Sequence, residues 1–470
     1  MEKYSKNINL EVINNENLKI KWQSLLIMTH IKINVEPPGP NAKKIAEQAE
    51  EIISPSIVRY YRFVMESGNG AIVRDVDGNS YIDMNAGIAV LALGTSPPEV
   101  VKAIDEATKR FLHYSYTDFY YSGIVNLARE LVNITPGRFK KRVFYGNSGA
   151  EAVETALKLS RFHTKRPRFI AYTGAFHGRT MGALSLTASK QAQVRGFSPM
   201  VPGVSHVPYP YCYRCPFGKT FPDCDYFCID YIKEQLFEKN VPPDEVAAIF
   251  FEPVQGEGGY IVPPIDYFRK LEKLVRGYGI LMADDEIQAG MGRTGKWFAI
   301  EHYGVEPDIV MIAKALASGM PLSATVSKDE LNDWPAGSHA TTFGGNPVSI
   351  EAALATIKTI KKSGLLNNAE KIGKILLKRL KEMEERYEIV GDVRGLGLMA
   401  GAELVIDKKT KKPNPEAAKK VIEYSWKHGV LLITAGISTL RFSPPLIIDE
   451  EILQEALDVV EQAIKEVQKI

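Results

Sequence analysis

Apolar segments that end in charged residues alternate with amphipathic segments between about residue 98 and residue 346. The apolar segments have the length of buried strands, and we expect strands near residues 143–146, 168–173, 246–254, 279–285 and 308–313. We expect helices near residues 98–112, 122–135 and 149–163. Alternation of this kind predicts an α/β fold, with a large domain whose mainly parallel sheet is flanked by helices.

The pattern changes after residue 346. Long helices near 347–362 and 366–387 lead to short strand segments within 393–404 and 429–442, and then to a terminal helix near 449–468. This order predicts a smaller α/β domain. Asp77-Gly78 between two alternating segments predicts a β-hairpin. We therefore expect an arm over residues 1–34, a segment over 35–80 that packs with the small domain, a large domain over 81–345 and a small domain over 346–470.

The composition narrows the class of protein. The chain has 470 residues, is 45% hydrophobic and carries a formal net charge of +2. We find no basic stripe with interleaved aromatic residues, which argues against a nucleic-acid partner. No apolar run approaches the roughly 20 residues of a membrane span, and the N-terminus lacks a signal pattern, so we expect a cytoplasmic protein. The Lys/Glu-rich segment 366–387 is typical of a thermophile.

All four cysteines fall in one short segment, at Cys212, Cys215, Cys224 and Cys228. The spacing is compatible with a metal site, with one or two local disulfides, or with free thiols. Neighbouring Tyr, Pro and Gly residues mark this segment as a surface loop. We expect none of the four to be catalytic and no metal in the active site.

Lys314 follows the apolar segment 309–312. An ammonium at the end of a buried strand must reach solvent, pair with an anion or lose its charge, and reaching solvent is the ordinary outcome. Asp285, however, lies 29 residues earlier, at the end of another apolar segment. Consecutive βα units bring two such groups to one edge of a parallel sheet, which is where α/β proteins hold ligands.

Three other expected strands also end in polar clusters. Ser148, Gly149 and Ala150 begin a helix whose open N–H groups favour a phosphate. Phe176 follows a strand and suits a planar ligand, while Arg179 suits a carboxylate. The third strand ends in two carboxylates among glycines, at Glu252 and Glu257. Each cluster alone is compatible with an ordinary loop or helix start, but together they match a planar, phosphorylated, cationic-ring aldehyde.

With these residues in order, the chain resembles the class III pyridoxal-phosphate (PLP) aminotransferases, which include 4-aminobutyrate, ornithine and acetylornithine aminotransferases. The similarity covers about residues 35–465 and implies a fold-type I PLP enzyme. Its motifs are at residues 148–152, 176–180, 285–295, 308, 313–314, 342–347 and 441–445. One motif departs from the family: its usual Gly-His-x-His-Pro turn is Gly-Thr-Ser-Pro here, at residues 94–97.

The resemblance implies roles for the residues around the cofactor. Lys314 would form a Schiff base with PLP and carry the proton between the substrate and the cofactor. Asp285 would pair with the protonated ring nitrogen and keep the cofactor an electron sink. Phe176, in one motif with His177, would stack on the ring, and Gln288 would lie near the ring hydroxyl.

The same resemblance implies a shared active site. Ser148, Gly149 and Ala150 would hold the phosphate with the help of Thr342 from a second subunit. A homodimer, or a higher oligomer built from it, is therefore implied.

The resemblance also implies how substrates are chosen. In relatives that act on ω-amino acids, the counterpart of Arg179 takes the substrate carboxylate, while the counterpart of Glu257 masks that of Arg441. The glutamate swings away when an α-amino acid or 2-oxo acid binds. Ile88 would line the pocket. We therefore expect a ping-pong aminotransferase that moves the amino group of 4-aminobutyrate, ornithine or a lysine-like donor to 2-oxoglutarate.

Two alternatives remain open. The family contains PLP-dependent amino-acid racemases with the same lysine, although related lactam racemases carry aspartate where this chain has Glu257. The other alternative is a protein that binds the cofactor without turnover, or a metal-stabilised scaffold built on the cysteine loop. The joint presence of Lys314, Asp285, Arg179 and Arg441 argues against that last alternative.

Overall fold

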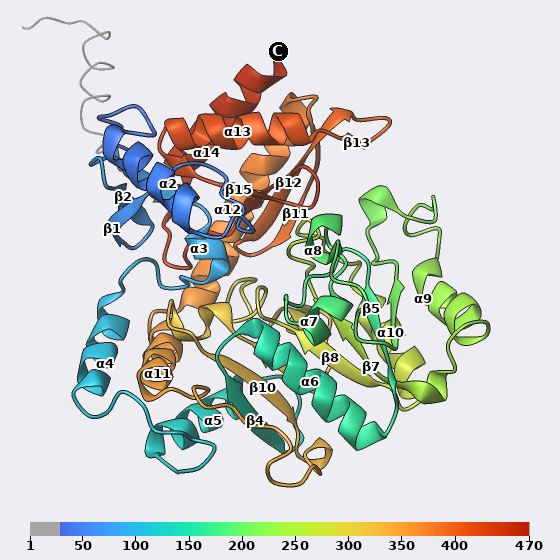
Figure 1. Ribbon diagram of the computed structural model, residues 1–470. Coiled ribbons are helices and arrows are strands. Elements are labelled where there is room, and N and C mark those ends of the chain that lie inside the picture. Colours follow the sequence, from blue (N-terminus) through green and yellow to red (C-terminus); the bar gives the residue numbers. More distant parts are fainter. Residues whose placement is uncertain (1–28, 470) are drawn as a thin grey trace, which may run out of the picture.

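A seven-stranded sheet forms the centre of the molecule in the computed structural model, which describes residues 29–469 (Figure 1). Residues 1–28 of the expected arm lie outside this range. The strand order is β4-β10-β9-β8-β7-β5-β6. Only β10 (Ser323–Lys328) runs against the others, so the prediction of a mainly parallel sheet is confirmed. The others are β4 (Lys141–Gly146), β5 (Arg168–Tyr172), β6 (Val204–Val207), β7 (Val246–Phe251), β8 (Leu281–Asp285) and β9 (Ile309–Ile312).

Helices cover both faces of this sheet. On one face, α6 (Gly149–Thr164) packs Val153, Ala156 and Leu159 against strand residues such as Phe250 and Met311. Small residues on the helix allow this close approach to the strands. The remaining helices of this part of the chain are α4 (Pro98–Thr108), α5 (Ser122–Ile134), α7 (Met181–Leu186), α8 (Gln191–Val194), α9 (Phe227–Tyr231), α10 (Tyr267–Arg276) and α11 (Pro347–Lys362).

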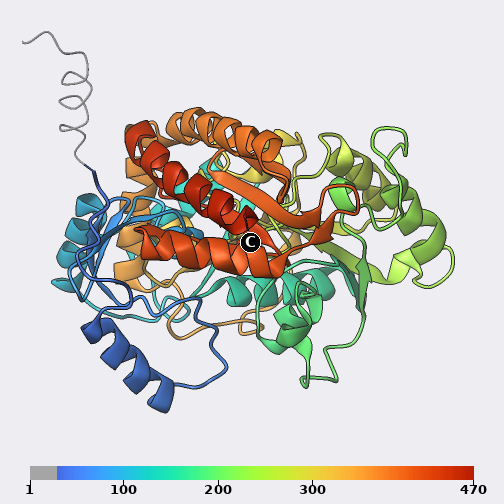
Figure 2. The same cartoon turned by 90° about the horizontal axis from the view of Figure 1, so that it is seen from above.

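An antiparallel sheet near the C-terminus forms a second part of the fold (Figure 2). Its order is β11-β12-β16-β15, with β13 paired to β12. The expected strand segment at 393–404 is in fact a hairpin, because the chain reverses at Gly397, whose φ is +55°. Helix α13 (Pro415–Lys427) was not expected. The other elements are α12 (Leu365–Arg386), β11 (Val390–Leu396), β12 (Met399–Asp407), β13 (Lys412–Pro413), β15 (Ile433–Ala435), β16 (Thr439–Phe442) and α14 (Glu450–Gln468).

The beginning and the end of the described chain meet in a third sheet, of order β1-β2-β3-β14. The expected hairpin at Asp77-Gly78 is confirmed by the antiparallel pairing of β2 with β3, and β3 also pairs in parallel with β14. The bounds are α2 (Pro40–Ile52), β1 (Met65–Asn69), β2 (Ile72–Asp75), β3 (Ser80–Asp83) and β14 (Val430–Leu431).

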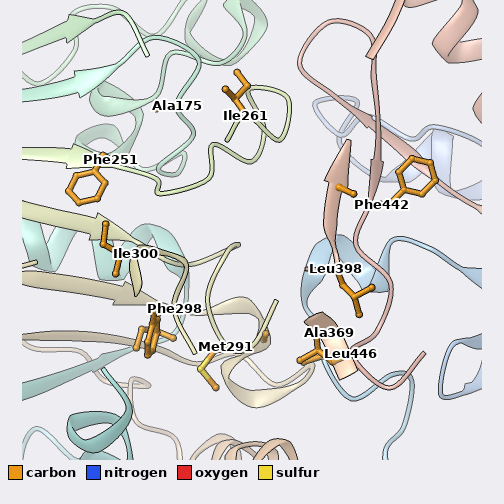
Figure 3. Close-up of a cluster of buried hydrophobic side chains, with 14 of the residues drawn as sticks. Ala175, Phe251, Ile261, Met291, Phe298, Ile300, Ala369, Leu398, Phe442 and Leu446 are labelled. Carbon is orange, nitrogen blue, oxygen red and sulfur yellow. The ribbon is translucent and has the colours of Figure 1, made fainter. Parts of the chain in front are cut away.

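Buried apolar side chains join these parts. In Figure 3, the ends of the central strands face the segment that carries Leu398, Phe442 and Leu446. These three residues belong to the same buried cluster as Phe251 and Phe298. The C-terminal part therefore packs against the carboxyl edge of the large sheet. Within residues 29–469, no helix is long and apolar enough to cross a membrane.

Candidate active site

Lys314 and Asp285 meet at the carboxyl edge of the sheet, as the sequence predicted. Asp285 is the last residue of β8 and lies in register with Met311 of β9, and Lys314 follows β9 with a positive φ of 36°. Burial lowers the pKa of the Lys314 amine, the charge of Asp285 raises it, and the charge of Arg441 lowers it. The net result is a lowered pKa, which favours the neutral, nucleophilic amine.

Asp285 is oriented by a buried network. Its Oδ2 lies 2.7 Å from Nδ1 of His177, and its Oδ1 accepts the N–H of Ile287. Burial opposes protonation of His177, but the hydrogen bond and charge of Asp285, with the charge of Glu252, raise its pKa. Burial raises the pKa of Glu252 to about 7, although the charge of His177 lowers it. Asp285 therefore presents an oriented carboxylate to the cavity.

A cavity of about 410 Å³ joins the predicted groups. Ser148 Oγ caps helix α6 by accepting the N–H of Glu151, and within residues 29–469 no acceptor lies against the N–H groups of Gly149 and Ala150. Two open donors at a helix N-terminus form an anion cradle. Its lining includes Ser148, Gly149, Ala150, Phe176, His177, Arg179, Glu252, Asp285, Gln288 and Lys314.

These groups fit PLP. The α6 N-terminus would hold the phosphate and Phe176 would cover the ring, while Asp285 would face the ring nitrogen. A side chain at Gly149 would fill the cradle's edge, because its Cβ would lie 2.9 Å from Ile287 Cδ1. Gln288 is also held in place, since its Oε1 accepts the hydroxyl of Tyr260 at 3.0 Å.

Two arginines approach the site from different elements. Arg179 lines the cavity from the loop after β5, with its guanidinium carbon 5.7 Å from the Phe176 ring centre. Arg441 lies on β16, is 3% exposed, and places Nη1 3.3 Å from Oε2 of Glu257. The charges of Arg441 and Glu257 both affect the pKa of Lys314, so these two residues are within electrostatic reach of it.

Sequence reasoning missed one contact of Glu257. Lys190 Nζ lies 2.6 Å from Oε1 of Glu257, so the carboxylate of Glu257 bridges two cations. No local pattern around Lys190 distinguishes it from an ordinary surface lysine. Glu252 was noted only as one of two strand-end acids, and its burial depends on the network around His177 rather than on its own segment.

Four predicted residues do not line the cavity: Ile88, Glu257, Thr342 and Arg441. Glu257 and Arg441 form their ion pair beside it. Thr342 is exposed on the surface of the single chain. Ile88 is also exposed and lies in α3 (Ala86–Ala89), where four consecutive residues have positive φ between 48° and 68°. Asp83 Oδ1 holds the start of this left-handed turn by accepting the N–H groups of Asn85 and Ala86. Three of the four turn residues carry a Cβ, so the turn is strained.

The cysteine loop lies apart from the cavity. Cys212, Cys215, Cys224 and Cys228 are unbridged thiols in the structure. Across the described part of the chain, no group of three or more His, Cys, Asp or Glu side chains is arranged to hold a metal. Burial and the neighbouring cysteines raise the pKa of Cys228 to about 12, which suppresses its thiolate near neutral pH.

Comparisons with known proteins agree with this geometry. A family model described as aminotransferase class-III matches residues 54–464. An alanine/serine racemase of Pyrococcus horikoshii is 40% identical over 449 residues, which cover 94% of each chain. A 4-aminobutyrate aminotransferase of Mycobacterium tuberculosis is 37% identical, over 91% of this chain and 97% of the relative. A solved omega-transaminase from Thermomicrobium roseum has a TM-score of 0.84 at 31% identity, over 91% of this chain and 98% of its own.

Proposed function

We propose that this chain, which belongs to the class III aminotransferase family of PLP-dependent enzymes, transfers the terminal amino group of a ω-amino acid to 2-oxoglutarate. The observation that supports this choice is the pair of arginines at one site, one of them already neutralised by a carboxylate. Arg179 is open to the cavity, whereas Arg441 is paired with Glu257.

The charge balance explains why such a pair suits two kinds of substrate. A ω-amino acid carries one carboxylate, far from the reacting amine, and Arg179 can bind it with two hydrogen bonds. Arg441 stays paired with Glu257 in that state. 2-Oxoglutarate carries two carboxylates and needs both arginines, so the Glu257 side chain must turn away from Arg441. Lys190, whose Nζ lies 2.6 Å from Oε1 of Glu257, is positioned to stay paired with the displaced carboxylate.

The remaining residues supply proton handling. When bound, PLP supplies a carbonyl for the amine and an electron-withdrawing ring. Lys314, whose pKa is lowered by burial, is the base that takes the substrate proton and returns it. Asp285, fixed by His177, keeps a negative charge where the ring nitrogen would lie.

We also propose the assembly and the setting implied by the sequence. In a homodimer, Thr342 of each chain would reach the phosphate cradle of the other, and its neighbour Phe343, 62% exposed, would be covered. The division at residues 80 and 345, a cytoplasmic location and a thermophilic source remain predictions.

A donor panel tests the proposed function. The PLP-loaded protein is incubated with 4-aminobutyrate, ornithine, lysine or L-alanine in the presence of 2-oxoglutarate, and glutamate is measured. We expect ω-amino donors to be preferred, and Arg179→Lys to weaken them because lysine cannot donate two parallel hydrogen bonds. Preference for α-amino donors would contradict the proposal. One methylene changes discrimination by only about 1–3 kcal/mol, so the panel must vary chain length finely.

Racemisation is a second candidate, which the 40% identity to an alanine/serine racemase supports. A racemase needs a proton donor on each face of the substrate Cα, and Lys314 provides one. The carboxylate of Glu257 is paired with both Lys190 and Arg441, so it is not free to serve as the second proton donor. Incubation with L-alanine and no keto acid, followed by chiral chromatography, distinguishes the two: accumulation of D-alanine at a rate comparable to transfer favours the racemase.

A further inference from the structure

Two arginines and a glycine form a row across the C-terminal sheet. Arg394 of β11 lies opposite Gly401 of β12, and Gly401 lies opposite Arg441 of β16. Residues 256–260, here called the gate loop because they contain Glu257, pass over this row. A Cβ on Gly401 would lie 3.2 Å from Cβ of Tyr260 and 3.5 Å from the carbonyl oxygen of Gly259. The absence of a side chain at Gly401 therefore seats the gate loop between the two arginines.

The backbone of the gate loop is anchored at two points. Arg394 donates from Nε and Nη2 to the carbonyl oxygen of Gly259, at 3.1 Å and 2.6 Å. The N–H of Gly436 donates to the carbonyl oxygen of Glu257 at 2.7 Å. Among residues 29–469, the side chain of Glu257 is held, in contrast, only by its ion pairs to Lys190 and Arg441. Its carboxylate can turn while its backbone stays fixed.

Arg394 is itself fixed by carboxylates. Its side chain is 10% exposed, with Nη1 2.5 Å from Asp392 and Nη2 2.8 Å from Glu403. Glu403 also pairs with Arg214 and accepts the hydroxyl of Tyr211. These carboxylates compensate the buried charge and aim the planar guanidinium at Gly259, which a lysine could not match with its single ammonium.

We infer that Arg394 is a positioning residue for substrate choice: by clamping the backbone of the gate loop at Gly259, it keeps the Glu257 carboxylate against Arg441. This inference rests on the proposed function, in which Glu257 masks Arg441 for the ω-amino donor. Loosening the clamp would expose the charge of Arg441 in the state that binds the donor, and would leave binding of 2-oxoglutarate, which needs Arg441 free, unchanged or improved.

Hydrogen exchange tests the clamp without relying on activity. The PLP-loaded wild type is compared with Arg394→Met, Arg394→Lys and the control Arg214→Met. The control removes another partner of Glu403, and within residues 29–469 the Arg214 side chain makes no hydrogen bond or ion pair to the gate loop. We expect the amides of the gate loop to exchange about tenfold faster or more in both Arg394 variants, since each loses directed charged hydrogen bonds. Arg214→Met should stay near the wild type. Unchanged exchange in Arg394→Met would overturn the clamp.

Steady-state kinetics test the consequence for substrate choice. In both Arg394 variants we expect KM for the ω-amino donor to rise about tenfold, with KM for 2-oxoglutarate unchanged or lower and kcat within about threefold, because binding rather than proton transfer is perturbed. Wild-type selectivity in Arg394→Lys would show that charge alone suffices and would overturn the inference.

Gly401→Ala provides an independent variant should the Arg394 variants fold poorly. Its methyl group would lie 2.8 Å from Cγ2 of Thr439 and press on Tyr260, so it should displace the gate loop without removing a charge and shift selectivity in the same direction. Wild-type exchange and selectivity in this variant would contradict the seating of the loop. If the wild type transfers no ω-amino group, the proposed function fails, whereas the exchange measurement still decides whether Arg394 holds the loop.

Discussion

Replacing Asp285 with asparagine removes one negative charge from the cavity while preserving the shape of the side chain. The asparagine oxygen can still accept a hydrogen bond from His177 or from the N–H of Ile287, the two partners of the aspartate. We therefore expect PLP to remain bound, because the phosphate cradle at α6 is untouched. What is lost is the charge that, in the proposed function, would pair with the positive ring nitrogen.

The magnitude follows from burial. Asp285 is 3% exposed, so solvent screens its charge poorly. Loss of one preorganised charged group at a buried site costs about 3–4 kcal/mol in the transition state, or about 10²–10³ in rate.

The assay is the single-turnover half-reaction with a ω-amino donor, followed by cofactor absorbance, with bound PLP measured separately after release in alkali. Asp284→Asn is the matched control: Asp284 is adjacent on β8 and fully buried, but does not line the cavity. We expect the control to react at nearly the wild-type rate. A rate for Asp285→Asn within about tenfold of the wild type, with PLP fully bound, would refute the assigned role.

Three further predictions concern stability and reactivity. Burial and the charges of Glu286 and Asp285 raise the pKa of Asp284, whose oxygens have no hydrogen-bond partner among the described residues. Because this carboxyl binds its proton more tightly in the folded than in the unfolded state, the folded protein loses stability as pH rises. Asp284→Asn should therefore raise Tm more at pH 8 than at pH 5, and an equal effect at both would contradict this. Ala89→Gly should raise Tm, because glycine adopts the left-handed φ of 59° without strain. The control Ala103→Gly, in the regular helix α4, should lower stability by about 1 kcal/mol. A similar loss of stability in both variants would show that α3 is unstrained. Cys228 should resist alkylation at pH 7 in mass spectrometry of the folded protein, because burial raises its pKa to about 12, and rapid labelling would contradict that environment.

The sequence predicted the core of the site because parallel topology does most of the placement. Once Asp285 and Lys314 are assigned to the ends of adjacent strands, the sheet brings them to one edge, and the same applies to Phe176 and the start of α6. Contacts between residues distant in sequence were less accessible. Two examples are the ion pair of Lys190 with Glu257 and the hydrogen bond from Arg394 to the carbonyl oxygen of Gly259. Both contacts depend on how a loop and a separate sheet pack together.

The fold shows the same division. Strong periodicity located α6, α11, α12 and α14 closely, whereas α13 was missed and the hairpin of β11 and β12 appeared as one segment. The turn between those two strands depends on the conformation of Gly397, which has no signal of its own among many glycines. The left-handed turn at α3 is imposed by Asp83 and the surrounding structure against local preference.

The most direct measurement of the central claim follows nitrogen and stereochemistry together. The purified, PLP-loaded protein is given ¹⁵N-labelled ω-amino donor with 2-oxoglutarate in one reaction and L-alanine alone in another, and the products are analysed by mass spectrometry and chiral chromatography. The proposed roles of Arg179 and of Arg441, masked by Glu257, predict ¹⁵N-labelled L-glutamate in the first reaction and L-alanine that stays L in the second. Absence of labelled glutamate in the first, with D-alanine accumulating in the second, would contradict the account and assign the site to racemisation.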